Sequence, residues 1–108
     1  MMTPGPGVRY GVILSNKDKI ITHVSDGFTD ITGYTVQESI GRPCSFIQGK
    51  ATNRQTIKML SQQLSENKVV RVYILNYRKD QTPFWNMLTI APLLDMNGRI
   101  TQFVGIQV

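Results

Sequence analysis

Cysteine is almost absent from this chain: Cys44 is the single one among 108 residues. One thiol can form neither an internal disulfide nor a cysteine cage around a metal ion. Histidine is equally rare, since His23 stands alone in an expected strand with no second ligand at a useful spacing, which argues against a haem or metal site. Cys44 is therefore either an inert, packed thiol or a single reactive one.

Long hydrophobic runs are absent too. No stretch approaches the roughly 18 apolar residues of a membrane span. The Pro- and Gly-rich residues 1–7 also lack the apolar core of a signal peptide. We therefore expect a cytoplasmic protein with no membrane span, in which residues 1–7 form a flexible leader and residues 8–108 form one domain.

Acidic residues are in the minority, with seven Asp and Glu against twelve Lys and Arg and a net charge of +5. Such a balance can favour nucleic acid, but the cationic residues are scattered and no zinc-finger spacing or aromatic RNA-binding motif accompanies them. We interpret them as solvated surface and expect no nucleic-acid partner, while keeping a plain interaction or nucleic-acid-binding domain as one alternative. Cys44 has no histidine partner of the kind used in catalysis, and no acidic residues are paired, so we expect a non-enzyme.

Hydrophobic periodicity predicts the α+β class, with a five-stranded antiparallel sheet and helices packed on one of its faces. Two apolar, β-branched runs over residues 8–14 and 20–24 flank a polar turn and predict two strands. Ser25 then offers the start of a short helix, which should end near Gly33.

A longer helix is predicted over residues 52–67, because Thr52 and Gln55 fit a capping box and an apolar stripe follows them. From residue 68 the hydrophobic period changes to two, which predicts three strands in a meander. The last two strands are joined by a turn at Asn97-Gly98.

Three side-chain amides, Asn76, Asn86 and Gln107, fall on strand faces that they share with large apolar residues. A buried amide without a partner costs about 1 to 3 kcal/mol. These amides either bond one another and nearby backbone, or bind a planar heterocycle such as a flavin, whose pyrimidine edge alternates donors and acceptors. Several apolar residues are then either plain core or the walls of a cofactor pocket: Phe46, Ile57, Leu60, Leu88, Ile90 and Phe103.

Four motifs follow one another along the chain: Gly41-Arg42-Pro43-Cys44-Ser45-Phe46-Ile47-Gln48-Gly49, Leu75-Asn76-Tyr77-Arg78-Lys79, Phe84-Trp85-Asn86 and Phe103-Val104-Gly105-Ile106-Gln107. In this order they resemble the light-oxygen-voltage (LOV) branch of the PAS-domain superfamily, and the resemblance spans roughly residues 12–107.

The resemblance implies a PAS fold and a flavin-binding blue-light photoreceptor. Cys44 matches the thiol that bonds reversibly to flavin C4a after light absorption, with protonation of N5. Asn76 and Asn86 match the amides that bind the pyrimidine edge. Gln107 matches the amide that reorients and relays the signal through the last strand to an effector outside this chain. Further matched positions in the pocket are Gln48, Leu88, Ile90, Phe103 and Gly105. The competing interpretation is a light-independent flavin, redox or small-ligand PAS sensor.

The chain departs from the family at Ser45 and Ser61, where arginines commonly bind the flavin phosphate. Arg54 and Lys58, one helical turn apart, are candidates to replace them, together with Lys50. We therefore expect FMN with a reduced dependence on the phosphate, with riboflavin or FAD as alternatives. The resemblance also raises a homodimer formed through the sheet.

Overall fold

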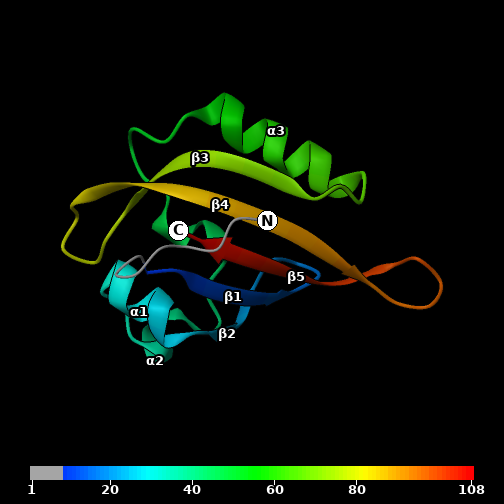
Figure 1. Ribbon diagram of the computed structural model, residues 1–108, viewed down its shortest axis with the longest axis horizontal. Helices are drawn as coiled ribbons and strands as arrows, with labels where there is room; N and C mark the ends of the chain where they lie inside the picture. Colours follow the sequence, from blue (N-terminus) through cyan, green and yellow to red (C-terminus); the bar gives the residue numbers. More distant parts are fainter. Residues whose placement is uncertain (1–8) are drawn as a thin grey trace.

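The computed structural model describes residues 9–108, so the predicted leader over residues 1–7 lies outside the described residues. It contains one five-stranded antiparallel sheet with the strand order β2-β1-β5-β4-β3, which confirms the predicted α+β fold (Figure 1). In chain order the elements are β1 (Gly11–Asn16), β2 (Ile21–Val24), α1 (Asp26–Thr32), α2 (Val36–Ser39), the 3-10 helix η1 (Cys44–Ile47), α3 (Arg54–Ser65), β3 (Val70–Tyr77), β4 (Pro83–Leu94) and β5 (Ile100–Gln107).

The order of the strands places the last one, β5, in the centre of the sheet between β1 and β4. Figure 1 shows α3 running beside β3, and α1 and α2 beside β1 and β2, so the helices lie at the two ends of the sheet. Between these helices, η1 and the turn between β1 and β2 lie opposite the middle of the inner sheet face.

The inner face of β3 follows the predicted alternation, because Val70, Val72, Ile74 and Asn76 are buried while Arg71 and Tyr73 are exposed. Buried side chains elsewhere divide into two hydrophobic clusters. The first joins α3 to the sheet and comprises Leu60, Leu64, Val70, Val72, Ile74 and Phe103. The second joins β1, β2, α1 and η1 and comprises Ile13, Ile21, Phe28 and Ile47.

Two predicted boundaries were wrong. β1 continues through Ser15 and Asn16, where the sequence predicts a turn, because both residues pair with β5. The longer helix is capped by Asn53 rather than Thr52, since the Asn53 side chain accepts from the backbone N–H of Gln55 and Thr56. Thr52 is instead buried, and its hydroxyl donates to the Leu75 carbonyl at 2.7 Å. Thr52, which precedes the cap of α3, thus connects the start of this helix to β3.

Candidate functional site

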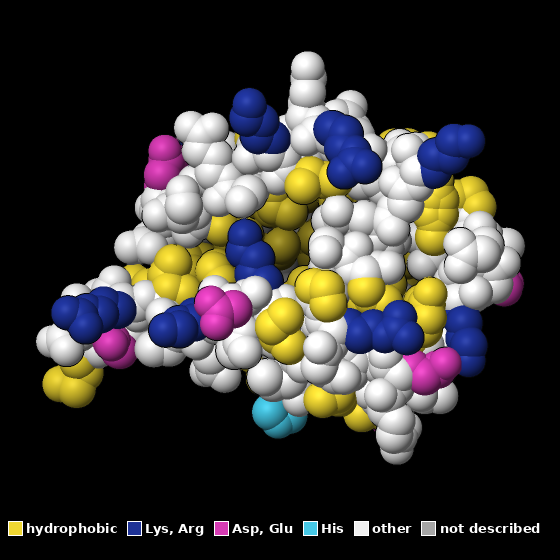
Figure 2. Space-filling view, turned by 180° about the vertical axis from the view of Figure 1, so that it is seen from behind, with side chains coloured by type: hydrophobic (Ala, Val, Ile, Leu, Met, Phe, Trp, Pro, Cys, Tyr) yellow, Lys and Arg dark blue, Asp and Glu magenta, His cyan; other side chains and the backbone are white. Residues whose placement is uncertain are grey.

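A cavity of about 390 Å³ lies between the two hydrophobic clusters. Figure 2 shows a hollow lined by hydrophobic side chains on the side of the molecule turned away in Figure 1. The structure brings most of the predicted site residues together around this cavity: Cys44, Gln48, Ile57, Leu60, Asn76, Leu88, Ile90, Phe103, Gly105 and Gln107. Cys44 and Gln107 are more than sixty positions apart in the sequence. The pairing of β5 with β1 and β4 brings Gln107 to the same cavity as Cys44.

The cavity has two apolar walls. Leu60 of α3 supplies one, and the sheet supplies the other through Ile90, Phe103 and their neighbours. Gly105 lies on the sheet wall, where an added Cβ would sit 3.7 Å from Leu88 Cδ1. A glycine there therefore leaves the wall flat, which suits a planar aromatic group.

The three predicted amides are almost fully buried, with 2% of Asn76 exposed and 1% each of Asn86 and Gln107. Asn86 Nδ2 donates to Asn76 Oδ1 at 2.9 Å, and Asn76 Nδ2 donates to the Leu75 carbonyl at 3.2 Å. Within residues 9–108, Asn86 Oδ1 and Gln107 Oε1 are buried and have no hydrogen-bond partner. Pairing among the amides is therefore incomplete, and two buried acceptors remain without a donor from residues 9–108.

Cys44 begins η1 and is partly buried at the cavity wall. Its backbone N–H donates to the Lys19 carbonyl at 2.9 Å, which fixes η1 against the turn between β1 and β2. Burial raises the pKa of the Cys44 thiol, while a hydrogen bond with Ser15 and the charge of Lys19 act in the opposite direction. The net direction is upward, so the thiol is neutral near pH 7 and has little reactivity as a nucleophile by itself.

Phe46 does not line the cavity, contrary to the expectation from the sequence. Its ring packs edge-on against Tyr34 with 4.8 Å between the ring centroids, and lies 6.4 Å from the centroid of Phe28. Because η1 is a tight 3-10 helix, Phe46 and Cys44 project in different directions, and Phe46 joins the cluster around α1. Asn86 is also absent from the cavity wall itself, and it reaches the cavity through its hydrogen bond to Asn76.

The three cations expected near a phosphate are placed elsewhere. Arg54 and Lys58 are exposed on α3 and do not line the cavity. Lys50 borders a smaller hollow beside Tyr77. These positions correct the expectation that a turn of α3 would direct two positive charges to the cavity.

Sequence reasoning missed part of the wall, namely Ile13, Ser15, Asp18, Lys19, Ile47, Leu64 and Ile74. The alternation along β1 could have revealed Ile13 and Ser15, which share its inner face. Lys19 had no such signal, because its position depends on a tight turn in which its φ is +65°.

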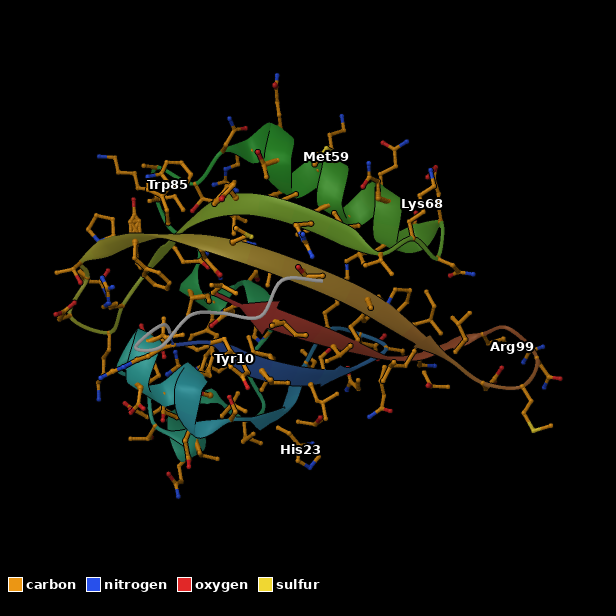
Figure 3. All side chains as sticks on the ribbon, viewed as in Figure 1. Tyr10, His23, Met59, Lys68, Trp85 and Arg99 are labelled. Carbon is orange, nitrogen blue, oxygen red and sulfur yellow. The ribbon has the colours of Figure 1, made fainter. Side chains whose placement is uncertain are left out.

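His23 is exposed on β2, and its Nδ1 lies 3.1 Å from the hydroxyl oxygen of Thr22. Figure 3 shows the imidazole at the edge of the molecule, pointing away from the sheet. In the part of the chain that the structure describes, His, Cys, Asp and Glu side chains form no group of three that could hold a metal ion.

Comparison with known proteins places this arrangement in a family. A family model described as a PAS domain matches residues 9–108. Among solved structures, the LOV domain from the Erythrobacter litoralis EL346 blue-light activated histidine kinase superimposes with a TM-score of 0.86 and 32% identity, covering 94% of this chain and 95% of that one. The chain is a LOV domain of the PAS superfamily. The dark structure of the blue-light photoreceptor Aureochrome1 LOV matches this LOV domain with a TM-score of 0.88 and 33% identity, over 91% of this chain and 73% of that one.

Curated relatives of the LOV domain are longer proteins. Phototropin-1A of Oryza sativa subsp. japonica is 48% identical over 88 residues, which cover 82% of this chain and 10% of that protein. A blue-light photoreceptor of Listeria innocua is 41% identical over 100 residues, which cover 90% of this chain and 39% of that protein. The LOV domain therefore spans well under half the length of these relatives. No helix among residues 9–108 has the length and apolar character needed to cross a membrane.

Proposed function

We propose that this LOV domain binds a flavin in the cavity and senses blue light through Cys44. The observation that carries the proposal is the pair of buried acceptors, Asn86 Oδ1 and Gln107 Oε1, without partners in residues 9–108. They accompany an apolar cavity with a cysteine on its wall. Two of the relatives are named as blue-light photoreceptors, which supports the same function.

The residues present fit a flavin. Asn76, Asn86 and Gln107 offer both C=O acceptors and NH2 donors, as the alternating pyrimidine edge requires. Apolar side chains of α3 and the sheet would enclose the rings from two sides, and Gln48 adds a polar contact. We propose FMN as the cofactor that this set of residues holds.

When bound, a flavin supplies the absorption of blue light and the electrophilic carbon C4a. With a flavin in the cavity, Cys44 would supply both the sulfur and the proton of a reversible addition to the rings, so the step would need no external oxidant or reductant. The raised pKa of Cys44 keeps that proton on the sulfur in the dark. The protonated thiol is therefore unreactive in the dark in this proposal.

Gln107 is suited to relay the change. It ends β5 and pairs with Gly11 of β1 and Leu88 of β4. A carboxamide can exchange its donor and its acceptor by rotation, so its hydrogen bonds can respond when a neighbouring acceptor becomes a donor. Because β5 lies in the centre of the sheet, we infer that the signal leaves through this strand towards an effector outside the chain.

The test is the visible spectrum of the purified protein in the dark and after a blue flash. We expect a blue absorption band that bleaches and then recovers, and a Cys44→Ala variant that keeps the band and does not bleach. Cys44→Ser is the conservative control, because it preserves size and polarity but lacks the sulfur nucleophile. A bleach that survives in both variants would show that the light response does not depend on Cys44, and a colourless protein would contradict flavin binding altogether.

A further inference from the structure

We propose that Lys19 is the residue that makes this cavity prefer a phosphorylated flavin to riboflavin, in place of the cations on α3. The inference rests on the proposed flavin binding and names the group that reads the end of the flavin side chain.

The turn between β1 and β2 holds Lys19 firmly. Its backbone N–H donates to the Asn16 carbonyl at 3.0 Å, and its own carbonyl accepts from the Cys44 N–H at 2.9 Å. The side chain lines the cavity, with Nζ 5.8 Å from the centroid of the Phe103 ring on β5. The amine thus lies over the sheet wall, and the segment that carries it also positions the reactive thiol.

Lys19 is the one cation among the residues that line the cavity, and Asp18 is the one anion. The ion pairs within residues 9–108 are Lys68–Glu66 and Lys79–Glu38, so neither engages Lys19. Its ammonium group is therefore available to a ligand, while the neighbouring carboxylate of Asp18 opposes an anionic one.

The hydroxyls of Ser45 and Ser61 also line the cavity, at the two positions where the family commonly has arginines. A hydroxyl can donate one hydrogen bond to a phosphate oxygen but carries no charge, so it supplies less stabilisation than a cation does. With a single cation and an opposing carboxylate, we expect the preference for FMN to be modest and to weaken as salt concentration rises.

The experiment compares the dissociation constants of FMN and riboflavin for the flavin-free protein, measured by fluorescence quenching at low and high salt. We expect Lys19→Gln to weaken FMN binding about tenfold. Its riboflavin binding should change less than about twofold, because riboflavin lacks the phosphate. Asp18→Asn should strengthen FMN binding about threefold by removing the opposing charge.

Lys17→Gln is the matched control, because it removes the same charge from the same turn at an exposed residue that does not line the cavity. Gln at position 19 meets the same positive φ as Lys, so the backbone strain is unchanged. The role of Lys19 is overturned if the ratio of the FMN affinity to the riboflavin affinity is unchanged in Lys19→Gln. It is also overturned if this ratio falls equally in Lys17→Gln or in an Arg54→Gln/Lys58→Gln variant. Either result would leave the proposed flavin binding untouched. A wild-type protein that binds neither flavin overturns the proposed function with it.

Discussion

Four residues of the β3–β4 hairpin reverse the usual placement of polar and apolar side chains on its two faces. On the inner face, Asn76 is 2% exposed and Asn86 is 1% exposed. On the outer face, Tyr73 is 65% exposed and Trp85 is 68% exposed. A sheet that was selected for stability alone would place these residues the other way round. The inner amides therefore support the proposed ligand site.

The strongest test of the difference between the two faces is to replace the inner amides with apolar side chains, as in an ordinary hydrophobic core. In an Asn76→Leu/Asn86→Leu variant both members of the hydrogen bond are removed together, so the flavin-free protein should be equally or more stable, by up to about 1 kcal/mol. The same variant should bind flavin about a hundredfold more weakly, because the hydrogen bonds to the pyrimidine edge are lost. Urea unfolding and flavin titration measure the two quantities.

A Trp85→Thr variant on the outer face is the control. Trp85 pairs with Leu75 across the hairpin and faces away from the cavity, so flavin affinity should change less than about twofold. Flavin binding that survives in the double leucine variant, or that falls equally in Trp85→Thr, would contradict the assignment of the inner amides to a ligand.

The alternation on β3 could be predicted from the sequence, because strand periodicity is local and Asn76 shares its face with Val70, Val72 and Ile74. The resemblance to LOV domains added the role of Cys44, which no local pattern indicates. The positions of Phe46 and Lys19 could not be predicted, since a 3-10 turn directs the first away from the cavity and a positive φ at a tight turn directs the second into it. The periodicity of hydrophobic residues along the chain carries no information on either of these side-chain directions.

A smaller contrast separates two glycines of the inner face. Gly105→Ala should leave the flavin-free protein folded with little change in stability, because the new methyl group meets only Leu88 Cδ1 at 3.7 Å and Ile90 Cγ1 at 4.0 Å. Since that methyl group would intrude on the cavity, flavin affinity should fall about tenfold. Titration with flavin, beside a thermal melt of the flavin-free protein, checks both statements.

Gly11→Ala should show the opposite behaviour. Its Cβ would lie 2.8 Å from the Cα and backbone N of Phe28, so β1 and α1 would have to separate. We expect a loss of about 1 to 3 kcal/mol in the free energy of unfolding. If Gly105→Ala destabilised the flavin-free protein as much as Gly11→Ala does, the space beside Gly105 would be packed core and not a ligand site.

The smallest expected effect concerns one of the contacts between the β3–β4 hairpin and the helices. Lys79, in the turn between β3 and β4, places its Nζ 2.6 Å from Glu38 Oε2 on α2. The hydrogen bond from Lys79, with further bonds from Thr35, lowers the pKa of Glu38 from 4.5 to about 2. A carboxyl with a lowered pKa stabilises the fold above pH 4.5, and this contribution is lost as the pH falls from 4.5 towards 2.

Glu38→Gln should therefore flatten the dependence of stability on pH in that window, measured by urea unfolding at neutral and acidic pH. The amide oxygen of Gln can still accept from the Thr35 N–H, so the cap of α2 is kept while the charge is removed. Lys79→Gln should flatten the curve less, because the bonds from Thr35 remain. An acid loss of stability in Glu38→Gln equal to that of the wild type would mean that this ion pair contributes nothing to the stability of the fold in that pH window.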